Sequence, residues 1–437
     1  MRQQTTKNDQ EDSNTSPTSA RVVVVGAGFA GGSFVHNLPP TLKKPGETLL
    51  VDCREEYAFV PLIHEVATGR VHPDSIRSPI APEGEVSYGF LKAEATGVNL
   101  EEKTLLTSSG PVWYRYLVLA PGSVTVPPPE GLSKYFQTFW TFNDALRLRC
   151  SLNKTWQAAL RQENLTLGGL TVIVAGGGAT GVELASEITV LFDYLKRRTA
   201  RTLAEKPRVV LLEATDRLMS WLDPYFHEVA LEELSRIGAE VRLNAPVTAA
   251  NEEGVEAGGE WLPAATRVWS AGGRANPLVR NLPGNHDPLG RVRVGDDLTL
   301  PDYPEVYVLG DGGVYEDPHL GPLPPTASVA VQQGPYAARD LGLRVRNIPE
   351  EKRRPFDFFN RGYVVSLGPK SAVANPLRVK LKGRVAQALY RSIFLYYMKS
   401  RGRLFTGADW TLDRTLGRVG FDLGYRQSAV NNQQDSP

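Results

Sequence analysis

The feature that most constrains the fold is a glycine-rich signature that occurs twice. The chain reads RVVVVGAGFAGG over residues 21–32 and TVIVAGGGATGVE over residues 171–183. Each copy is a short run of β-branched residues, followed by G-x-G-x-x-G and then by a helix-like stretch. This order is typical of a strand, turn and helix that bind a dinucleotide. The repeat therefore predicts an α/β chain with two Rossmann-like domains, each holding one dinucleotide.

Size and composition limit the alternatives. A chain of 437 residues is expected to form two or three domains. The formal net charge of +1 gives no global attraction to nucleic acid. The two cysteines, Cys53 and Cys150, lie in no C-x-x-C pair, which argues against a zinc site and a dithiol centre. The first twenty residues are polar and predict a disordered tail rather than a signal peptide. No window offers the roughly 18 apolar residues needed to cross a bilayer.

The first signature contains the residues expected of a phosphate-binding turn. Val22–Val25 read as a buried parallel strand, and Gly26, Gly28 and Gly31 follow at the fingerprint spacing. The pyrophosphate would lie at the helix N-terminus, where backbone N–H groups are free. Asp52 ends the next predicted strand, 24 residues after Gly28, and is expected to bind a ribose hydroxyl.

The second signature repeats this pattern with one departure. Gly176, Gly178 and Gly181 carry the fingerprint, and Glu213 ends the strand at 208–212. Glu213 comes 35 residues after Gly178, which predicts an extended helix from about 179 to 201. A carboxylate at this place accepts from the 2′-hydroxyl of NADH and repels the 2′-phosphate of NADPH, so NADH is favoured. Arg217 could instead favour the phosphate, although pairing with Asp216 or Glu213 is its simpler role.

Other glycines and acids accompany the two signatures. Predicted strands run into Gly122, into Gly272 and into Gly310-Asp311, where backbone can approach a planar or anionic group. Asp311 is placed to accept hydrogen bonds from a ribityl chain, although G-D-G-G is also ordinary turn chemistry. Glu183, in the first turn of the second helix, is either a favourable charge at a helix N-terminus or a carboxylate that faces the nicotinamide.

In this order the motifs resemble the type II NADH dehydrogenases, which are single-subunit, non-proton-pumping NADH:quinone oxidoreductases. The resemblance spans about residues 21–425, and its most selective parts are PLIHEVATG at 61–69 and the glutamine segment at 327–333. It implies non-covalent FAD in the first site and NADH in the second. By the same resemblance, Asp311 contacts the flavin, Glu183 lies beside the nicotinamide and Glu213 binds the ribose.

The resemblance also implies a domain plan and a quinone pocket. The FAD-binding domain is expected to be discontinuous, at 21–142 and 274–345, with the NADH-binding domain inserted at 143–273 and a C-terminal region at 346–437. The family's A-Q-x-x-x-Q segment reads Ala327-Ser328 with Gln332 here, so only the second glutamine is retained. Ser328, Gln332 and His64 are the candidate pocket residues, and a structural role for His64 is equally open. No metal site is expected.

The C-terminal region predicts a membrane surface contact. Residues 376–408 contain no acid and carry eight basic residues: Arg378, Lys380, Lys382, Arg384, Arg391, Lys399, Arg401 and Arg403. Val385, Leu389, Ile393 and Tyr396 fall on one helix face, whereas 377–382 alternate as in a strand. A basic amphipathic segment is typical of an interfacial anchor, so residues 376–425 are expected to lie on a bilayer. Trp410, Phe421 and Tyr425 would add interfacial aromatic rings. Core packing, a homodimer seam and nucleic-acid binding are the alternatives.

These observations predict an enzyme that passes a hydride from NADH to FAD and then two electrons to a membrane quinone. Glu183 and Gln332 would orient the nicotinamide and the quinone, and the protein would lie on the cytoplasmic face of a membrane. The alternatives are a related flavin reductase with a soluble acceptor, a sulfide:quinone oxidoreductase, for which Cys53 and Cys150 are a poor redox pair, and a non-catalytic NADH-responsive scaffold.

Overall fold

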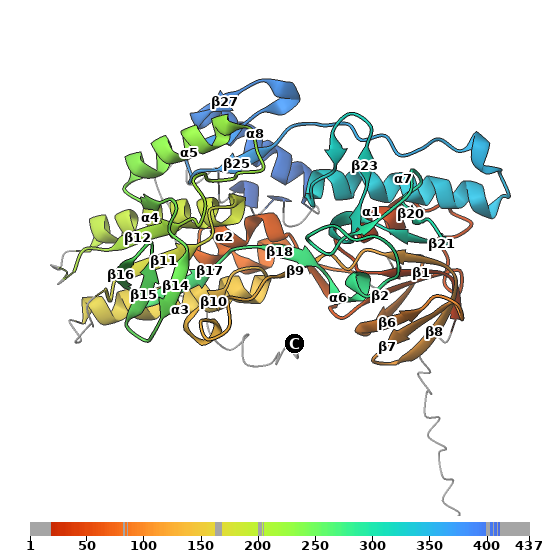
Figure 1. The fold of residues 1–437 in the computed structure, drawn as a ribbon, viewed down its shortest axis with the longest axis horizontal. Helices are drawn as coiled ribbons and strands as arrows, with labels where there is room; N and C mark the ends of the chain where they lie inside the picture. The colour runs from red at the N-terminus through yellow and green to blue at the C-terminus, as the bar shows by residue number, and fades with distance from the viewer. Residues whose placement is uncertain are drawn as a thin grey trace, which may run out of the picture. The chain divides into compact units, whose positions relative to one another are not determined.

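The protein is described by a computed structural model that covers residues 19–81, 84, 86–161, 168–199, 203, 205–398, 403, 404, 406–408 and 410. Of the tail predicted at 1–20, residues 1–18 lie outside these residues, whereas Ser19 and Ala20 are the first residues of strand β1 (Ser19–Val25), so the tail prediction was wrong for those two. Phe421 and Tyr425 also lie outside the described residues. The chain divides into two compact units, shown in Figure 1. The first unit comprises the described residues within Met1–Glu55, Ile80–Gly122 and Ala275–Phe358. The second unit comprises those within Glu56–Pro79, Ser123–Arg274 and Phe359–Pro437.

The first unit is built on a mixed sheet in the order β20-β21-β8-β1-β2-β5, with β7 and β6 continuing from β8. β1 pairs in parallel with β2 and with β8, so the predicted strands at 22–25 and 48–51 are confirmed as neighbours. Val22, Val23 and Val24 have no exposed surface, as expected of a parallel strand that is covered on both faces. Helix α7 packs across α1, and Gly334 permits the close approach because a Cβ there would lie 2.6 Å from the Ala30 carbonyl oxygen.

The elements of this unit are β1 (Ser19–Val25), α1 (Phe29–Asn37), β2 (Thr48–Asp52), β5 (Gly89–Lys92), β6 (Ala95–Asn99), β7 (Thr104–Thr107), β8 (Gly110–Leu119), α6 (Pro277–Arg280), β19 (Val292–Arg293), β20 (Thr299–Leu300), β21 (Tyr303–Val308), β22 (Gly313–Val314), β23 (Glu316–Asp317), β24 (Gly321–Pro322) and α7 (Ala327–Val345).

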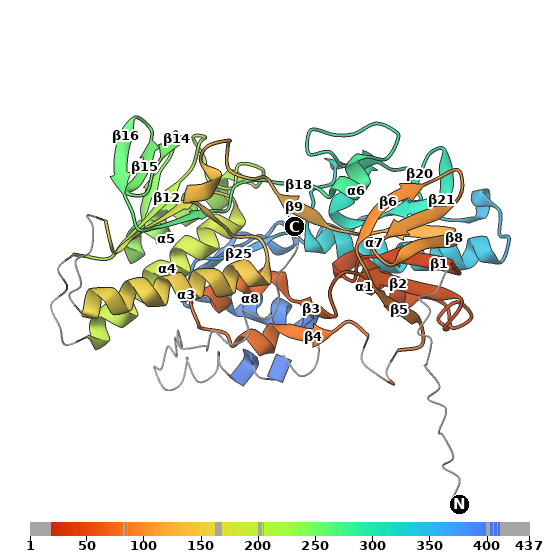
Figure 2. The ribbon, with the colours of Figure 1, turned by 90° about the horizontal axis from the view of Figure 1, so that it is seen from below.

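The second unit contains a parallel sheet in the order β10-β17-β11-β12-β13. Its helix α4 follows β11 and packs on β11 and β12, which is the strand–turn–helix arrangement of the second signature. An antiparallel sheet, β14-β15-β16, projects at one end of this unit (Figure 2). The C-terminal region adds the antiparallel sheet β25-β26-β27, on which α8 packs.

The elements of this unit are β3 (Glu56–Ala58), α2 (Ile63–Ala67), β4 (Arg77–Pro79), β9 (Ser123–Thr125), β10 (Gln137–Thr138), α3 (Phe142–Leu160), β11 (Thr171–Ala175), α4 (Ala179–Arg198), β12 (Arg208–Leu212), α5 (Pro224–Ile237), β13 (Glu240–Arg242), β14 (Val247–Ala250), β15 (Gly254–Ala257), β16 (Glu260–Pro263), β17 (Thr266–Trp269), β25 (Val364–Ser366), β26 (Ala372–Ala374), β27 (Leu381–Lys382) and α8 (Gly383–Tyr397). The short strand β18 (Gly273–Ala275) spans the boundary between the units.

Local sequence explains the ends of the longer helices. Thr141 and Asp144 form a capping box at the start of α3, so two of the free N–H groups are satisfied. Asp223 caps α5 ahead of Pro224, and Gly238 ends that helix in the left-handed conformation. Helix α4 has 20 residues. This length accounts for the wide spacing between Gly178 and Glu213, because most of the intervening chain is helix.

Candidate functional site

The first glycine-rich turn joins β1 to α1 and leaves open space beside one glycine only. A Cβ at Gly26 would lie 2.2 Å from the Ala120 carbonyl oxygen, and one at Gly31 would lie 1.9 Å from the Gly26 carbonyl oxygen. Neither position can hold a side chain without movement of backbone. Gly28 has nothing within 4 Å of its Cβ position and caps α1 without a side-chain bond. The turn is therefore closed toward the protein and open at the N-terminus of α1, where a phosphate fits.

Asp52 connects the end of β2 to this turn. Its Oδ2 accepts a hydrogen bond from the Ala27 N–H at 2.8 Å, and its Oδ1 accepts from the Arg54 N–H at 2.9 Å. The Arg54 side chain also donates to the carboxylate. The predicted acid therefore lies at the glycine turn, although it is already hydrogen-bonded to the protein.

The second turn, between β11 and α4, repeats the same geometry. A Cβ at Gly176 would lie 2.7 Å from the Ala271 nitrogen, and one at Gly181 would lie 1.9 Å from the Gly176 carbonyl oxygen. Gly178 again has open space and caps the helix without a side-chain bond. Glu213 accepts from the Gly177 N–H at 2.7 Å. Each turn thus combines a tight glycine pair, an open glycine and a carboxylate from the next strand, and each fits a dinucleotide.

The other predicted cofactor glycines occupy turns that favour glycine. Gly122, Gly272 and Gly310 have positive φ of 75°, 73° and 67°. Gly310 and Asp311 lie in a 3-10 turn directly after β21, as the VYVLGD motif predicts. The Gly310 N–H donates to Gln333 Oε1 at 2.7 Å, and Gln333 is fully buried. Gln333 is a positioning residue that the sequence reasoning missed, although it adjoins the predicted Gln332.

Ser328 and Gln332 lie one turn apart on α7 in the first unit. Gln332 Nε2 donates to the Ser328 carbonyl oxygen at 2.9 Å, and both residues are half-buried. The pair therefore occupies one helix face and keeps accessible surface.

Glu183 and His64 meet in the second unit, from α4 and α2. His64 Nδ1 lies 3.8 Å from Glu183 Oε2, and the Ser366 N–H donates to Glu183 Oε1 at 3.1 Å. His64 is 2% exposed. Burial raises the pKa of Glu183 to about 8, and the Ser366 hydrogen bond opposes that shift. Burial therefore favours the protonated form of Glu183 more than that of an exposed glutamate.

Buried charged side chains surround this pair, and they were not predicted from the sequence. The Arg70 guanidinium donates to both carboxylate oxygens of Glu187, and its Nε lies 3.8 Å from Glu65 Oε2. Burial raises the pKa of Glu187, and Arg70 opposes that shift. A signal was available in the sequence, because Glu183 and Glu187 are four residues apart and so share one face of α4.

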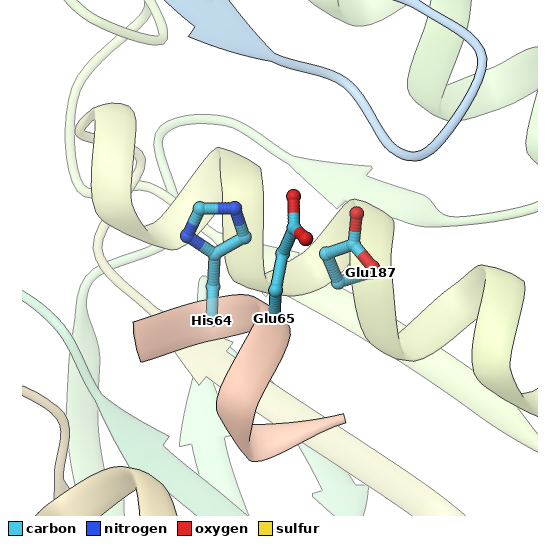
Figure 3. A group of neighbouring side chains, drawn as sticks. All are labelled: His64, Glu65 and Glu187. Atoms are coloured by element: carbon cyan, nitrogen blue, oxygen red, sulfur yellow. The ribbon is translucent and has the colours of Figure 1, made fainter. Parts of the chain in front are cut away.

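The side chains of His64, Glu65 and Glu187 lie next to one another (Figure 3), and their possible metal-ligand atoms are within 4.8 Å of one another. Arg70 already supplies the positive charge between the two carboxylates. Burial, aided by Arg70, lowers the pKa of His64 to about 3, so its ring is neutral. We interpret the group as an internal ion-pair cluster rather than a metal centre.

The C-terminal region places the predicted amphipathic face outward. Val385 and Tyr396 of α8 are 65% and 72% exposed, and Leu389 and Ile393 between them are half-exposed. The opposite face, with Ala386, Gln387 and Tyr390, is buried. No helix among the described residues is both long and apolar enough to span a bilayer.

Three predictions for this region need correction. Trp410 is 3% exposed and its Nε1 donates to Glu65 Oε2 at 2.8 Å, so it is a buried residue and not an interfacial one. Lys380 and Lys382 pair with Asp223 and Glu232 at the N-terminal and central parts of α5, so their charges are partly compensated. The strand-like alternation predicted for 377–382 is realised only in β27, because residues 376–378 form a 3-10 turn. Lys399 and Arg401 lie outside the described residues.

Comparisons with known proteins agree with this geometry. The sequence profile of the pyridine nucleotide-disulphide oxidoreductases matches residues 20–334. The type II NADH:quinone oxidoreductase Ndh of Mycobacterium tuberculosis is 27% identical over 446 aligned residues, which cover 97% of this chain and 93% of that protein. The type II NADH:quinone oxidoreductase of Staphylococcus aureus is 27% identical over 382 residues, covering 85% and 94%.

The fold is shared with a solved structure. NDH2 from Plasmodium falciparum, in complex with RYL-552, aligns with a TM-score of 0.78 at 16% identity, covering 92% of this chain and 99% of that one. The predicted α/β fold and the predicted resemblance to type II NADH dehydrogenases are confirmed. With both glycine turns inside the matched segment, the chain belongs to the pyridine nucleotide-disulphide oxidoreductase family.

Proposed function

We propose that this protein is a non-proton-pumping NADH:quinone oxidoreductase that binds FAD in its first unit and NADH in its second. The observation that carries the proposal is the pair of matching glycine turns, each with its own carboxylate, in one chain. A single glycine turn would fit many nucleotide-binding proteins, whereas two such turns in one chain suit an enzyme that binds both a dinucleotide cofactor and a dinucleotide reductant. When bound, FAD accepts a hydride from NADH and passes two electrons to the quinone.

The residues proposed to hold FAD all belong to the first unit. Gly26, Gly28 and Gly31 form the turn, Asp52 orients its backbone, and Gly122, Gly310 and Asp311 supply the remaining contacts. The α1 N-terminus stabilises the negative charge of the pyrophosphate through its free N–H groups.

The residues proposed to hold NADH are Gly176, Gly178, Gly181, Glu213 and Gly272. Glu213 favours NADH over NADPH because its carboxylate repels a 2′-phosphate. Arg217 pairs with neither Asp216 nor Glu213 within the described residues, so the comparison of NADH with NADPH tests this assignment directly. Glu183 is proposed to orient the nicotinamide.

Ser328 and Gln332 are proposed to line the quinone pocket, and the assignment of His64, which is 2% exposed in the second unit, rests on the resemblance alone. Half-buried Ser328 and Gln332 offer a hydroxyl and an amide that can hydrogen-bond a quinone carbonyl. A sulfide:quinone oxidoreductase is the less favoured alternative, because Cys53 and Cys150 are both free thiols. The domain plan inferred from the resemblance, with FAD at 21–142 and 274–345, NADH at 143–273 and a C-terminal region at 346–437, is part of this proposal.

One experiment tests the proposed function. The purified protein is expected to show a flavin absorbance spectrum that bleaches when NADH is added without oxygen and recovers when a short-chain quinone follows. NADPH is expected to bleach it at least tenfold more slowly at equal concentration. A colourless protein that takes up no FAD would overturn the proposal. Bleaching without recovery by quinone, but with recovery by an iron–sulfur protein, would assign a soluble acceptor.

The outer face of α8, formed by Val385, Leu389, Ile393 and Tyr396, is proposed to lie on the cytoplasmic surface of a membrane. The double substitution Val385→Ser and Tyr396→Ser is expected to weaken binding to anionic phospholipid vesicles by about tenfold or more. Each exposed apolar side chain that enters the interface contributes roughly 1 kcal/mol or more, since full burial contributes about 1.5–3 kcal/mol. Sedimentation with vesicles measures the bound fraction.

A matched control separates this face from general surface hydrophobicity. Trp113 on β8 is 47% exposed and belongs to the first unit. Trp113→Ser is expected to leave vesicle binding unchanged. Unaltered binding of the α8 double variant would exclude the proposed face, and a change from dimer to monomer in ultracentrifugation would assign it to a homodimer seam.

A further inference from the structure

The His64 imidazole is held between two side chains that come from distant parts of the sequence. Its Nε2 lies 3.3 Å from the Tyr390 hydroxyl of α8, and its Nδ1 lies 3.8 Å from Glu183 Oε2 of α4. All three residues belong to the second unit. Tyr390 has no exposed surface, and its ring packs on that of Phe394 with centroids 4.1 Å apart. The three groups therefore form a buried row in which the imidazole is the middle member.

The hydrogen positions follow from the chemistry of the two outer groups. A neutral imidazole has one N–H and one lone pair. A phenol is a stronger hydrogen-bond donor than acceptor, so the Tyr390 O–H donates to Nε2 and the imidazole proton is on Nδ1. That N–H then points toward Glu183. At 3.8 Å it acts mainly by electrostatic attraction, because this separation exceeds a direct hydrogen bond.

The other groups around Glu183 either contact its second carboxyl oxygen or act on it through charge. The Ser366 N–H of β25 contacts the other carboxyl oxygen of Glu183. Glu65 and Glu187 act on Glu183 through charge and disfavour its ionisation, whereas Arg70 is engaged by those two acids. The groups that face Glu183 from the packed elements are thus His64, Glu65, Glu187, Tyr390 and the Ser366 N–H. Among these, the Ser366 N–H favours the ionised form of Glu183, and the imidazole N–H of His64 is the other donor that faces the carboxyl group.

We propose that Tyr390 and His64 are positioning residues for Glu183, with the Tyr390 hydroxyl fixing the imidazole so that its Nδ1–H faces the carboxyl group and favours the ionised form. This inference rests on the proposed function, in which Glu183 lies beside the nicotinamide. The sequence shows no link between residues 64, 183 and 390, because their association depends on the tertiary fold.

The first test is the pH dependence of NADH-driven flavin bleaching, measured by stopped flow. The native protein is expected to show a midpoint near pH 8, set by Glu183. Tyr390→Phe removes the hydroxyl and keeps the ring, so the imidazole loses its fixed tautomer and the midpoint is expected to rise by about half a pH unit. A midpoint equal to that of the native protein would overturn the proposal.

Further variants give this result its controls. Tyr397→Phe removes a hydroxyl from the same helix, where it bonds Arg361 instead, and is expected to leave the midpoint in place. His64→Leu is expected to raise it as Tyr390→Phe does. His64→Asn can place an amide N–H where Nδ1–H stood and is expected to restore most of the native value. Glu183→Gln is expected to abolish the transition, and an equal shift in Tyr397→Phe would contradict the assignment.

A second readout does not depend on turnover. In protein labelled with 15N-histidine, His64 is expected to show the Nδ1–H tautomer between pH 6 and 9, and Tyr390→Phe is expected to produce a mixture of tautomers. An Nε2–H tautomer in the native protein would overturn the proposal. If NADH fails to bleach the flavin while the histidine spectrum is as expected, the proposed function fails and the positioning pair stands.

Discussion

Replacing Gly31 with alanine is expected to destabilise the first unit by about 3 kcal/mol or more and to leave the purified protein without bound flavin. A Cβ at this position would lie 1.9 Å from the Gly26 carbonyl oxygen and 3.1 Å from its carbon. Both atoms are backbone, so the clash cannot be relieved by rotating a side chain. Either α1 must move away from β1 or the turn must open, and both changes disrupt the site at the helix N-terminus. Urea denaturation and the ratio of flavin to protein absorbance measure the two effects.

Gly28→Ala provides the matched control in the same turn. Its φ of −70° is accessible to alanine, and no atom lies within 4 Å of the new Cβ. Stability of the flavin-free protein is therefore expected to change by less than about 0.5 kcal/mol. Flavin affinity is nevertheless expected to fall, because the added methyl group fills the space that the pyrophosphate would enter. Equal destabilisation by Gly31→Ala and Gly28→Ala would contradict the assignment of Gly31 to backbone packing and of Gly28 to flavin binding.

The parts of the fold that the sequence predicted are those determined by local chemistry. The strands β1 and β11 appear as runs of buried apolar residues that lead into a turn that requires glycine, and β2 and β12 appear as similar runs that end at an acid. The long helix inferred from the spacing between Gly178 and Glu213 is confirmed as α4. The carboxylates at the strand ends reach the glycine turns in both units, because neighbouring parallel strands end at the same edge of a sheet.

The parts that could not be predicted are contacts between residues far apart in the chain. Tryptophan is a residue type typical of membrane interfaces, yet Trp410 is buried against Glu65, which is 345 positions away in the sequence. Lys380 and Lys382 form part of a basic run, yet acids on α5 pair with them. Whether a charged side chain is buried can be predicted only when its partner is known. No periodic pattern in the sequence relates Arg70 to Glu187.

Replacing Arg70 with methionine is expected to be among the most destabilising single changes in the second unit. Glu187 and Glu65 are 0% and 1% exposed, and Arg70 is the cation between them. Removal of one partner from a buried ion pair leaves an uncompensated charge and typically costs about 3–5 kcal/mol. Methionine retains most of the apolar volume of the side chain, so the loss reports on the charge rather than on a cavity.

The effect of this substitution is expected to depend on pH in a definite direction. Burial already raises the pKa of Glu187 from 4.5 to about 7 in the presence of Arg70. A folded-state pKa above the unfolded value means that the folded protein binds more protons, so stability falls as pH rises through this window. Without Arg70 the pKa rises further and the window extends upward. The loss relative to the native protein is therefore expected to be larger at pH 8 than at pH 5, with the increase arising above about pH 7. Urea denaturation at both pH values measures the difference.

The double substitution Arg70→Met and Glu187→Met distinguishes a missing charge partner from missing packing. With both charges absent, Glu65 with its Trp410 hydrogen bond and the neutral His64 remain in the cluster. Replacing a buried ion pair with apolar residues of similar volume is often neutral or stabilising, so the double variant is expected to recover most of the stability that Arg70→Met loses. Its stability should also depend less on pH than that of the single variant, because Glu187, whose raised pKa drives the pH dependence of that variant, is absent. A double variant as unstable as Arg70→Met at both pH values would show that Arg70 contributes through its packing, and the ion-pair interpretation of the cluster would then be wrong.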